Sequence, residues 1–258
     1  VRDHVGVKPL YYYWDPSTRS ARSGQVPLIF SSEIKAILAH DITREGNTEA
    51  LNLYFRMLYV PAPQTMFKNI YKLEPGSYLR FANGQVQKER YWNPTPGQPI
   101  KNKSDAIAQI QSLMRDSVKR QLISERPVGV FLSGGIDSTA ILGLATEALG
   151  QPPKTYTVGF DVQPEKFNAD LTLAKKTAQH YNTDHHELIV TGDDCAKHLE
   201  DVIYHMDEPV ANATQVATYL LSKFARKDIV VGLGGDGGDE LFGGYQRYEL
   251  SRIISVYQ

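Results

Sequence analysis

The sequence predicts an α/β protein in which a parallel sheet follows a β-rich first part. The second part of the chain alternates short apolar runs with helical patterns, and this alternation is typical of parallel strands joined by helical crossovers. The first part is instead rich in aromatic residues and turn signals. With 258 residues, the chain has room for one large domain or two small ones.

The first part begins with predicted strands and short helices. Aromatic or apolar runs predict the strands, and apolar residues on one face predict the helices. The expected strands cover residues 10–14 and 28–32, and the expected helices cover 32–40 and 47–59. An Asn83-Gly84 pair between the runs 77–81 and 86–91 is a strong signal for a tight turn, so we expect a β-hairpin there.

The second part starts after a linker at residues 93–103, which carries three prolines and a glycine. We therefore expect two domains, 1–95 and 96–258. Apolar residues at helical spacing from Ala106 to Val118 predict a helix, and the apolar run 128–132 suits a buried parallel strand. Further predicted helices cover 137–149, 169–181, 194–206 and 214–226, and further predicted strands cover 155–160, 187–190 and 229–233.

Composition excludes several functional classes. The 28 Lys and Arg against 29 Asp and Glu give a formal net charge of −1. The chain therefore lacks the overall positive charge that is typical of proteins that bind nucleic acid through their whole surface. The single cysteine, Cys195, excludes a disulfide framework and a cysteine-based structural zinc site, and it fits a reducing compartment. No apolar run approaches the roughly 18 residues of a membrane span.

The first candidate site is residues 133–138, Ser-Gly-Gly-Ile-Asp-Ser, between a predicted strand and a predicted helix. The glycines allow a tight turn, and the N–H groups of the loop and of the helix N-terminus form an anion site. The hydroxyls of Ser133 and Ser138 add donors for phosphate. Neither the Walker A ending nor the dinucleotide fingerprint is present. An ordinary turn with an Asp cap is the alternative, but the whole string favours phosphate binding.

The second candidate site is residues 234–240, Gly-Gly-Asp-Gly-Gly-Asp-Glu, which also follow a predicted strand. Loops that leave the carboxyl ends of parallel strands share one edge of the sheet. Asp137 and Asp239 can then face one Mg²⁺, with phosphate oxygens of a nucleotide completing its octahedral coordination. The alternative is that the acids of this loop only cap a helix start, where acidic residues are favoured anyway.

Three histidines could suggest a metal site, but the spacing argues against it. His180, His185 and His186 have no carboxylate placed to complete a zinc site on one face. We therefore expect packing or hydrogen-bonding roles for them. Cys195 falls within a predicted helix, so we expect it to be a small buried residue.

These strings together resemble a known family. Residues 133–138 resemble the pyrophosphate loop of N-type ATP pyrophosphatases, and residues 239–245, Asp-Glu-Leu-Phe-Gly-Gly-Tyr, narrow the resemblance to glutamine-hydrolysing asparagine synthetases. Residues 2–12 and 31–36 resemble the end of the family's glutaminase domain. Residues 59–63, 72–76 and 90–92 resemble its interdomain stretch, and 184–187 and 207–209 fit its synthetase domain. The implied fold is an ATP-pyrophosphatase sheet preceded by the β-rich end of an Ntn-type glutaminase domain.

The resemblance implies a reaction and its reactants. ATP and Mg²⁺ activate the side-chain carboxylate of aspartate as an adenylate, and ammonia from glutamine then gives asparagine, AMP and pyrophosphate. The implied partners are small molecules, with no nucleic acid and no membrane, and the implied location is the cytoplasm. The resemblance is compatible with a homodimer.

The resemblance also implies roles for individual residues. Pyrophosphate and ATP are expected at Ser133, Gly134, Gly135, Asp137 and Ser138, with Leu132, Val158 and Gly235 lining the adenosine pocket. Asp137 and Asp239 would hold the metal. Asp236 would be the catalytic acid that pairs with a lysine beyond Gln258.

The chain departs from the family in several places. The family's glutaminase nucleophile is an N-terminal cysteine, whereas residue 1 here is Val, and the family's glutamine-binding positions lie upstream of it. Asp236 stands where Glu is common, and Gly234 stands where Ser is frequent. We therefore expect the chain to be a fragment of a longer enzyme. This fragment by itself should not hydrolyse glutamine.

Other functions stay open at this point. A related amidotransferase could act on the carboxylate of a surface sugar, a peptide or a ring-closing substrate. A non-catalytic nucleotide-binding module is a second alternative. A tRNA-modifying adenylase is a third, but it would need a basic RNA-binding region, and no Lys/Arg-rich stretch is visible.

Overall fold

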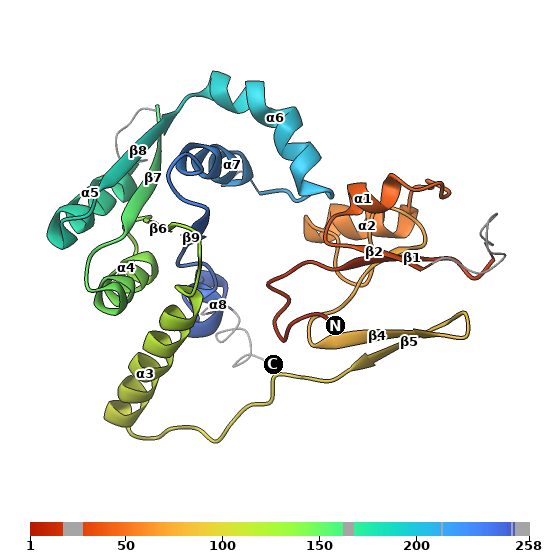
Figure 1. The fold of residues 1–258 in the computed structure, drawn as a ribbon, viewed down its shortest axis with the longest axis horizontal. Helices are drawn as coiled ribbons and strands as arrows, with labels where there is room; N and C mark the ends of the chain where they lie inside the picture. Colours follow the sequence, from red (N-terminus) through yellow and green to blue (C-terminus); the bar gives the residue numbers. More distant parts are fainter. Residues whose placement is uncertain (18–27, 162–167, 213, 249, 251–258) are drawn as a thin grey trace. The chain divides into compact units, whose positions relative to one another are not determined.

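The computed structural model describes residues 1–17, 28–161, 168–212, 214–248 and 250 (Figure 1). The chain divides into two compact units. Unit 1 comprises Val1–Gln98 and Leu199–Ala213, and unit 2 comprises Pro99–His198 and Thr214–Gln258. The division at Gln98 lies three residues after the domain boundary expected from the linker. The grouping of residues 199–213 with the first unit has no counterpart in that expectation.

Unit 1 contains a three-stranded antiparallel sheet of order β2-β1-β3, formed by β1 (Tyr11–Trp14), β2 (Leu28–Ser31) and β3 (Ile70–Lys72). The helices α1 (Ile34–Leu38) and α2 (Thr48–Met57) follow β2 in the sequence. Tyr13 in the central strand is fully buried and packs with Ile34, Ile37 and Ile70. The strands and helices expected here are confirmed. The three-residue strand β3 was not predicted.

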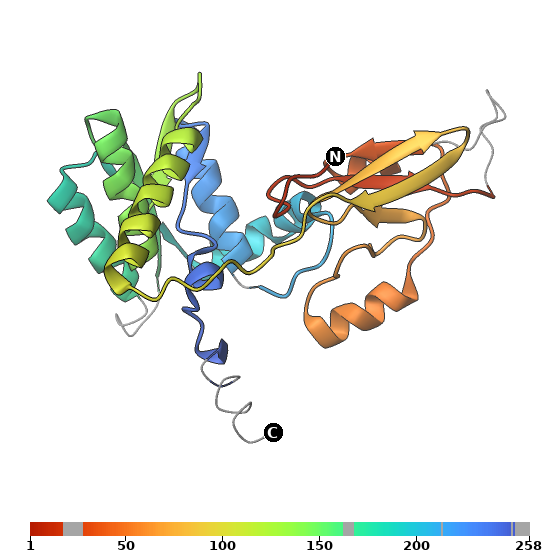
Figure 2. The same cartoon turned by 90° about the horizontal axis from the view of Figure 1, so that it is seen from below.

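The expected hairpin is also confirmed. Strands β4 (Ser77–Ala82) and β5 (Gln85–Arg90) pair antiparallel (Figure 2). Asn83 and Gly84 between them have φ of 53° and 72°. Positive φ at both central positions matches the twist of the flanking strands, which is why Asn-Gly is favoured at this turn.

Residues 199–213 are attached to unit 1 by Asp207. Its carboxylate accepts hydrogen bonds from the N–H groups of Ile34 at 2.9 Å and Lys35 at 3.3 Å. The helix α1 has no side-chain cap of its own at Glu33, so Asp207 caps it from a distant part of the sequence. Asp207 also forms a 2.9 Å ion pair with the ammonium of Lys35. Burial would lower the pKa of Lys35, but hydrogen bonds to Asp207 and Glu33 outweigh it and raise the pKa.

Glu208 provides a second attachment of the same segment. Its carboxylate lies 2.7 Å from the ammonium of Lys72 and accepts a hydrogen bond from the N–H of Met66 at 3.3 Å. Burial raises the pKa of Glu208, although Lys72 acts in the opposite direction. The segment is therefore built into unit 1 through two buried acids.

Unit 2 contains a four-stranded parallel sheet of order β8-β7-β6-β9. Its strands are β6 (Val128–Phe131), β7 (Lys154–Phe160), β8 (His185–Val190) and β9 (Val231–Leu233). Its helices are α3 (Lys103–Gln121), α4 (Ile136–Leu149), α5 (Ala169–Tyr181), α7 (Thr214–Ala225) and α8 (Gly238–Phe242). The helix α6 (Gly192–Met206) contains the point at which the two units divide. The predicted parallel α/β class is confirmed.

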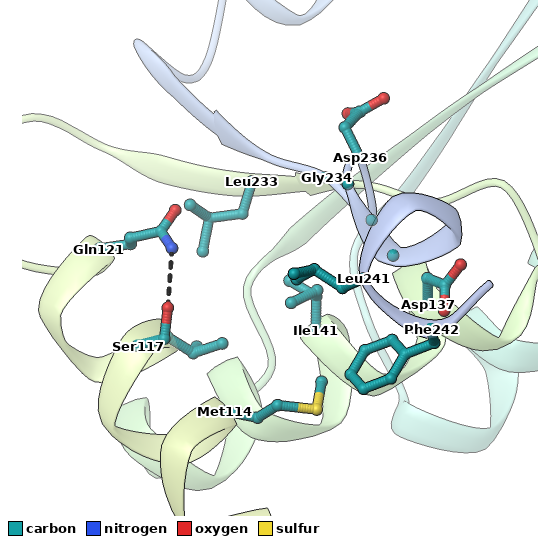
Figure 3. A pocket seen from close by; sticks show the side chains of 14 residues that line it. Met114, Ser117, Gln121, Asp137, Ile141, Leu233, Gly234, Asp236, Leu241 and Phe242 are labelled. Carbon is teal, nitrogen blue, oxygen red and sulfur yellow. Dashed lines mark hydrogen bonds between the residues drawn. The ribbon is translucent and has the colours of Figure 1, made fainter. Parts of the chain in front are cut away.

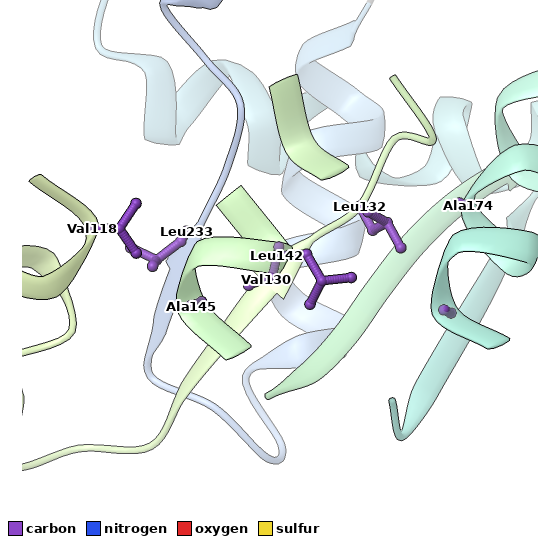
Figure 4. Close-up of a cluster of buried hydrophobic side chains, with 8 residues drawn as sticks. Val118, Val130, Leu132, Leu142, Ala145, Ala174 and Leu233 are labelled. Carbon is purple, nitrogen blue, oxygen red and sulfur yellow. The ribbon is translucent and has the colours of Figure 1, made fainter. Parts of the chain in front are cut away.

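Helices cover both faces of this sheet. Val130 and Leu132 point to one face, where they pack with side chains from α3, α4 and α5 (Figure 4). Phe131 packs on the other face, with Leu221 and Ala225 of α7. Alternate residues of a strand point to opposite faces, so an apolar run such as 128–132 is what a doubly covered strand requires.

The predicted elements of unit 2 are present in the structure, with ends that differ by up to three residues. The short helix α8 is not among the predicted helices, but a helix start at this place was the alternative given for the acids of the second loop, and Asp239 and Glu240 lie in its first turn. In the part of the chain that the structure describes, no helix combines the length and apolarity needed to cross a bilayer.

Candidate functional site

The two glycine-rich loops lie at the carboxyl ends of neighbouring strands in unit 2. Strands β6 and β9 pair in parallel, with Val130 opposite Leu233. The loop 133–138 leaves β6 and enters α4, and the loop 234–240 leaves β9 and enters α8. The sheet edge inferred from the sequence therefore exists, and the two loops meet there.

The first loop turns at Gly134, which has a φ of +76°. A Cβ at this position would fall 2.6 Å from the carbonyl oxygen of Asp170 and 2.7 Å from the nitrogen of Ala174, both in the backbone of α5. The position needs glycine for its left-handed backbone and for this close approach of a helix. The packing of α5 thus holds the loop against the sheet.

The two serines of the first loop bond to each other. The Ser138 hydroxyl is 3.0 Å from the Ser133 hydroxyl and accepts a hydrogen bond from the Ser133 N–H at 3.1 Å. Ser138 is buried and Ser133 is exposed. Ser138 therefore braces the loop, whereas Ser133 is open to a ligand.

The N-terminus of α4 is suited to an anion. Its N-cap is Gly135, and no side chain caps the helix. The first N–H groups of a helix have no intrahelical partner, so here they are available to a phosphate, with the helix dipole in the favourable direction. The side chain of Ile136, the first residue of the helix, is 88% exposed.

The second loop presses directly on the first turn of α4. A Cβ on Gly235 would lie 2.7 Å from the backbone nitrogen of Ser138. A Cβ on Gly238 would lie 2.6–2.9 Å from the carboxylate atoms of Asp137. Glycines at both positions therefore make room for Asp137 at the contact between the loops.

A pocket of about 250 Å³ opens beside this contact (Figure 3). Among its lining residues are Asp137, Gly235 and Asp236. Apolar side chains of α3, α4 and α8 form much of its wall, and the Asp236 carboxylate points away from them (Figure 3). Three of the predicted site residues and an apolar wall thus line the same pocket.

The other predicted residues lie at or near the same edge. The Leu132 side chain is 2% exposed and belongs to the core, so only its backbone is available to a nucleotide. Val158 is half-buried in β7. Asp239 lies in the first turn of α8, and its carboxylate lies against Gly244. The sharing of a metal by Asp137 and Asp239 stays a prediction.

Within the described residues, no group of three or more His, Cys, Asp or Glu side chains could hold a metal ion. A Mg²⁺ held by Asp137 and Asp239 would therefore need oxygens of the nucleotide among its ligands. This requirement fits the donors present, because Mg²⁺ is commonly bound by one or two carboxylates together with substrate phosphates.

The histidines of β8 have other contacts. The Nδ1 atom of His185 is 2.8 Å from the hydroxyl of Thr155, and burial lowers the pKa of His185. The His186 ring stacks on Tyr156 with ring centroids 5.1 Å apart. Cys195 is a half-buried free thiol in α6.

The asparagine synthase model matches residues 109–257, and the glutamine amidotransferase domain model matches residues 1–92. The chain belongs to the asparagine synthase family. The two glycine-rich loops and all predicted site residues fall in the part of the chain that the asparagine synthase model matches.

Individual asparagine synthetases match nearly the whole chain. A putative glutamine-hydrolyzing asparagine synthetase of Methanocaldococcus jannaschii is 35% identical over 96% of this chain and 47% of its own length. The glutamine-hydrolyzing asparagine synthetase 3 of Bacillus subtilis is 33% identical over 99% of this chain and 42% of its own length. The chain thus spans less than half the length of these relatives.

A solved structure also matches part of the chain. The ammonia-dependent NAD synthetase of Campylobacter jejuni matches 54% of this chain and 60% of its own, with a TM-score of 0.37 and 19% identity. At this level the similarity adds nothing to the assignment to the asparagine synthase family.

Two features of this site have no signal in the local sequence. Gly238 belongs to the second loop, but its close contact with Asp137 depends on the packing of two strands that are distant in sequence. The hydroxyl of Thr157 donates a hydrogen bond to the Leu132 carbonyl oxygen at 2.5 Å, and the two residues are 25 positions apart. No local pattern signals either contact.

Proposed function

We propose that the chain is part of an enzyme that makes asparagine from aspartate, ATP and ammonia released from glutamine. The aspartate side chain is activated as an aspartyl-adenylate, and AMP and pyrophosphate are released. A carboxylate needs this activation because its oxygen is a poor leaving group. Family membership supports the amidotransferase class, and residues 1–92 support glutamine as the nitrogen source.

One observation carries the ATP part of the proposal. An uncapped helix N-terminus, a glycine turn and an aspartate meet where two parallel strands end. Backbone N–H groups would bind the phosphates, and Ser133 would add a hydroxyl. A bound Mg²⁺ would supply positive charge to offset the charge that grows on the phosphates. Asp137 and Asp239 are the residues that would hold it.

The remaining roles are proposed from the resemblance to the family. The backbone of Leu132 and the residues Val158 and Gly235 would contact adenosine. Asp236, exposed in the second loop, would hold a lysine ammonium near the reacting phosphate. The ion pair would keep that lysine protonated and in position.

Product identification tests this proposal. The full-length chain, meaning the whole enzyme of which residues 1–258 are proposed to be part, is supplied with ATP, Mg²⁺, glutamine or ammonium, and a panel of carboxylic acids. We expect asparagine, AMP and pyrophosphate in equal amounts when aspartate is present. Consumption of ATP with another acid, and none with aspartate, would show that the enzyme adenylates a different carboxylate. ATP binding without turnover of any acid would show that the protein is a non-catalytic nucleotide-binding module.

A further inference from the structure

A buried hydroxyl in β7 contacts the start of the first loop. The Thr157 side chain donates a hydrogen bond of 2.5 Å to the carbonyl oxygen of Leu132, and both residues are only 2% exposed. The Leu132 N–H in turn donates to the Tyr156 carbonyl at 2.9 Å. Neighbouring residues of β7 thus hold both polar groups of Leu132.

Leu132 is the last residue before the loop, so its peptide groups set the direction in which the loop leaves the sheet. Its side chain is fixed in the core between β6 and the covering helices. Beyond it the backbone turns at Gly134, with a φ of +76°. A small rotation of the peptide between Leu132 and Ser133 would move the N–H groups that follow.

We propose that Thr157 is a positioning residue for the nucleotide site. Its hydroxyl holds the Leu132 carbonyl and thereby aims the loop 133–138 at the phosphates. This inference rests on the proposed function, because it assigns Thr157 to the ATP site. An apolar side chain of the same shape would leave the Leu132 carbonyl buried without this donor, and the peptide would turn to find another.

The same strand offers a matched control. Thr155 lies two residues before Thr157, on the same face of β7, and is fully buried. Its hydroxyl is 2.8 Å from the Thr183 hydroxyl and 2.8 Å from Nδ1 of His185. Replacing either threonine by valine therefore removes one buried, hydrogen-bonded hydroxyl from the same strand, but only Thr157 contacts the residue before the loop.

The experiment measures ATP affinity in the full-length chain by calorimetry. Thr157→Val should weaken ATP binding in Mg²⁺ by about tenfold, the size expected for one lost buried hydrogen bond. Thr155→Val and Thr157→Ser should stay within about twofold of the wild type, because the first leaves the loop untouched and the second keeps the hydroxyl. In steady-state assays, Thr157→Val should raise KM for ATP and leave KM for aspartate unchanged.

Three results would overturn the proposal: unchanged ATP affinity in Thr157→Val, equal losses in both valine variants, or a failure of Thr157→Ser to restore binding. If Thr157→Val does not fold, Thr157→Ser is compared with Thr157→Ala, which differs from it only in the hydroxyl. A tenfold difference in ATP affinity between them supports the proposal, and equal affinity contradicts it.

Hydrogen exchange separates this inference from the proposed function. Amide exchange at residues 133–138, measured without nucleotide, should be faster in Thr157→Val than in Thr155→Val. A wild type that binds no ATP would reject the proposed function. Equal exchange in the two variants would reject the positioning role, whether or not ATP binds.

Discussion

Asp137 stands where the two glycine-rich loops touch. Its carboxylate occupies space that a side chain on Gly238 would fill, and its backbone lies under Gly235. The helix N-terminus beside it attracts anions, while its own charge attracts a cation. This combination suits a nucleotide that arrives with Mg²⁺, because the phosphates and the metal then find separate partners.

The substitution Asp137→Asn tests this role. It removes the charge and keeps the shape, so it should weaken ATP binding in Mg²⁺ by about tenfold or more and have a much smaller effect in EDTA. Titration calorimetry under both conditions makes the measurement. Glu240→Gln, an exposed acid of the second loop, is the control and should bind like the wild type. Equal affinities for wild type and Asp137→Asn in Mg²⁺ would show that Asp137 does not hold a metal ion.

The substitution Asp236→Ala tests the proposed role of Asp236 in catalysis. Removing a group that acts mainly in the transition state lowers kcat and changes substrate affinity little. In the full-length chain we expect pyrophosphate release to slow by about 100-fold, with ATP affinity within a few-fold of the wild type. Asp236→Glu, which keeps the carboxylate, should keep turnover. Normal turnover in the alanine variant would show that Asp236 is not required. Ammonia-dependent asparagine synthesis by residues 1–258 alone would show that pairing with a lysine beyond Gln258 is not required.

At the scale of elements, the position of α1 depends on a distant segment. The helix is five residues long and has no side-chain cap at Glu33. Such a short helix is not stable by itself, so its packing and the cap from Asp207 define it. Asp207 has a φ of 60°, a left-handed backbone that Asn also tolerates, so Asp207→Asn changes the charge without new backbone strain.

We expect Asp207→Asn to lower the free energy of unfolding of unit 1 by about 1–2 kcal/mol, because Lys35 loses its buried partner and the cap loses an acceptor. Both tryptophans, Trp14 and Trp92, lie in unit 1, so tryptophan fluorescence in urea reports this unit. Glu33→Gln removes the more exposed partner of the same lysine and should cost less than about 0.5 kcal/mol. Equal effects of the two substitutions would show that the cap adds nothing.

At the scale of the whole molecule, the chain contains two parts that match different family models. The family model for glutamine amidotransferases matches its first part, and the asparagine synthase model matches its second. Hydrolysis of an amide in such enzymes needs an activated nucleophile. The single thiol of these 258 residues, Cys195, is half-buried in α6 and lies outside the part matched by the amidotransferase model.

Residues 1–258 should therefore produce no glutamate from glutamine. A coupled glutamate assay on the purified polypeptide makes the measurement, with Cys195→Ser as the matched variant. Glutamate formation that disappears in Cys195→Ser would make Cys195 the nucleophile. Formation that persists in the variant would point to a nucleophile other than a thiol.

The amino-acid sequence by itself determined most of the helices and strands, the parallel sheet, the hairpin and the two loops. Each of these depends on local patterns: an apolar run for a buried strand, Asn-Gly for a turn, and glycines between a strand and a helix. Only the tertiary structure decided that Gly238 meets Asp137, that Thr157 holds Leu132, and that Asp207 caps α1. These contacts join residues far apart in sequence, and short-range hydrogen bonds and steric exclusion act on distances in space, which the order of residues along the chain does not contain.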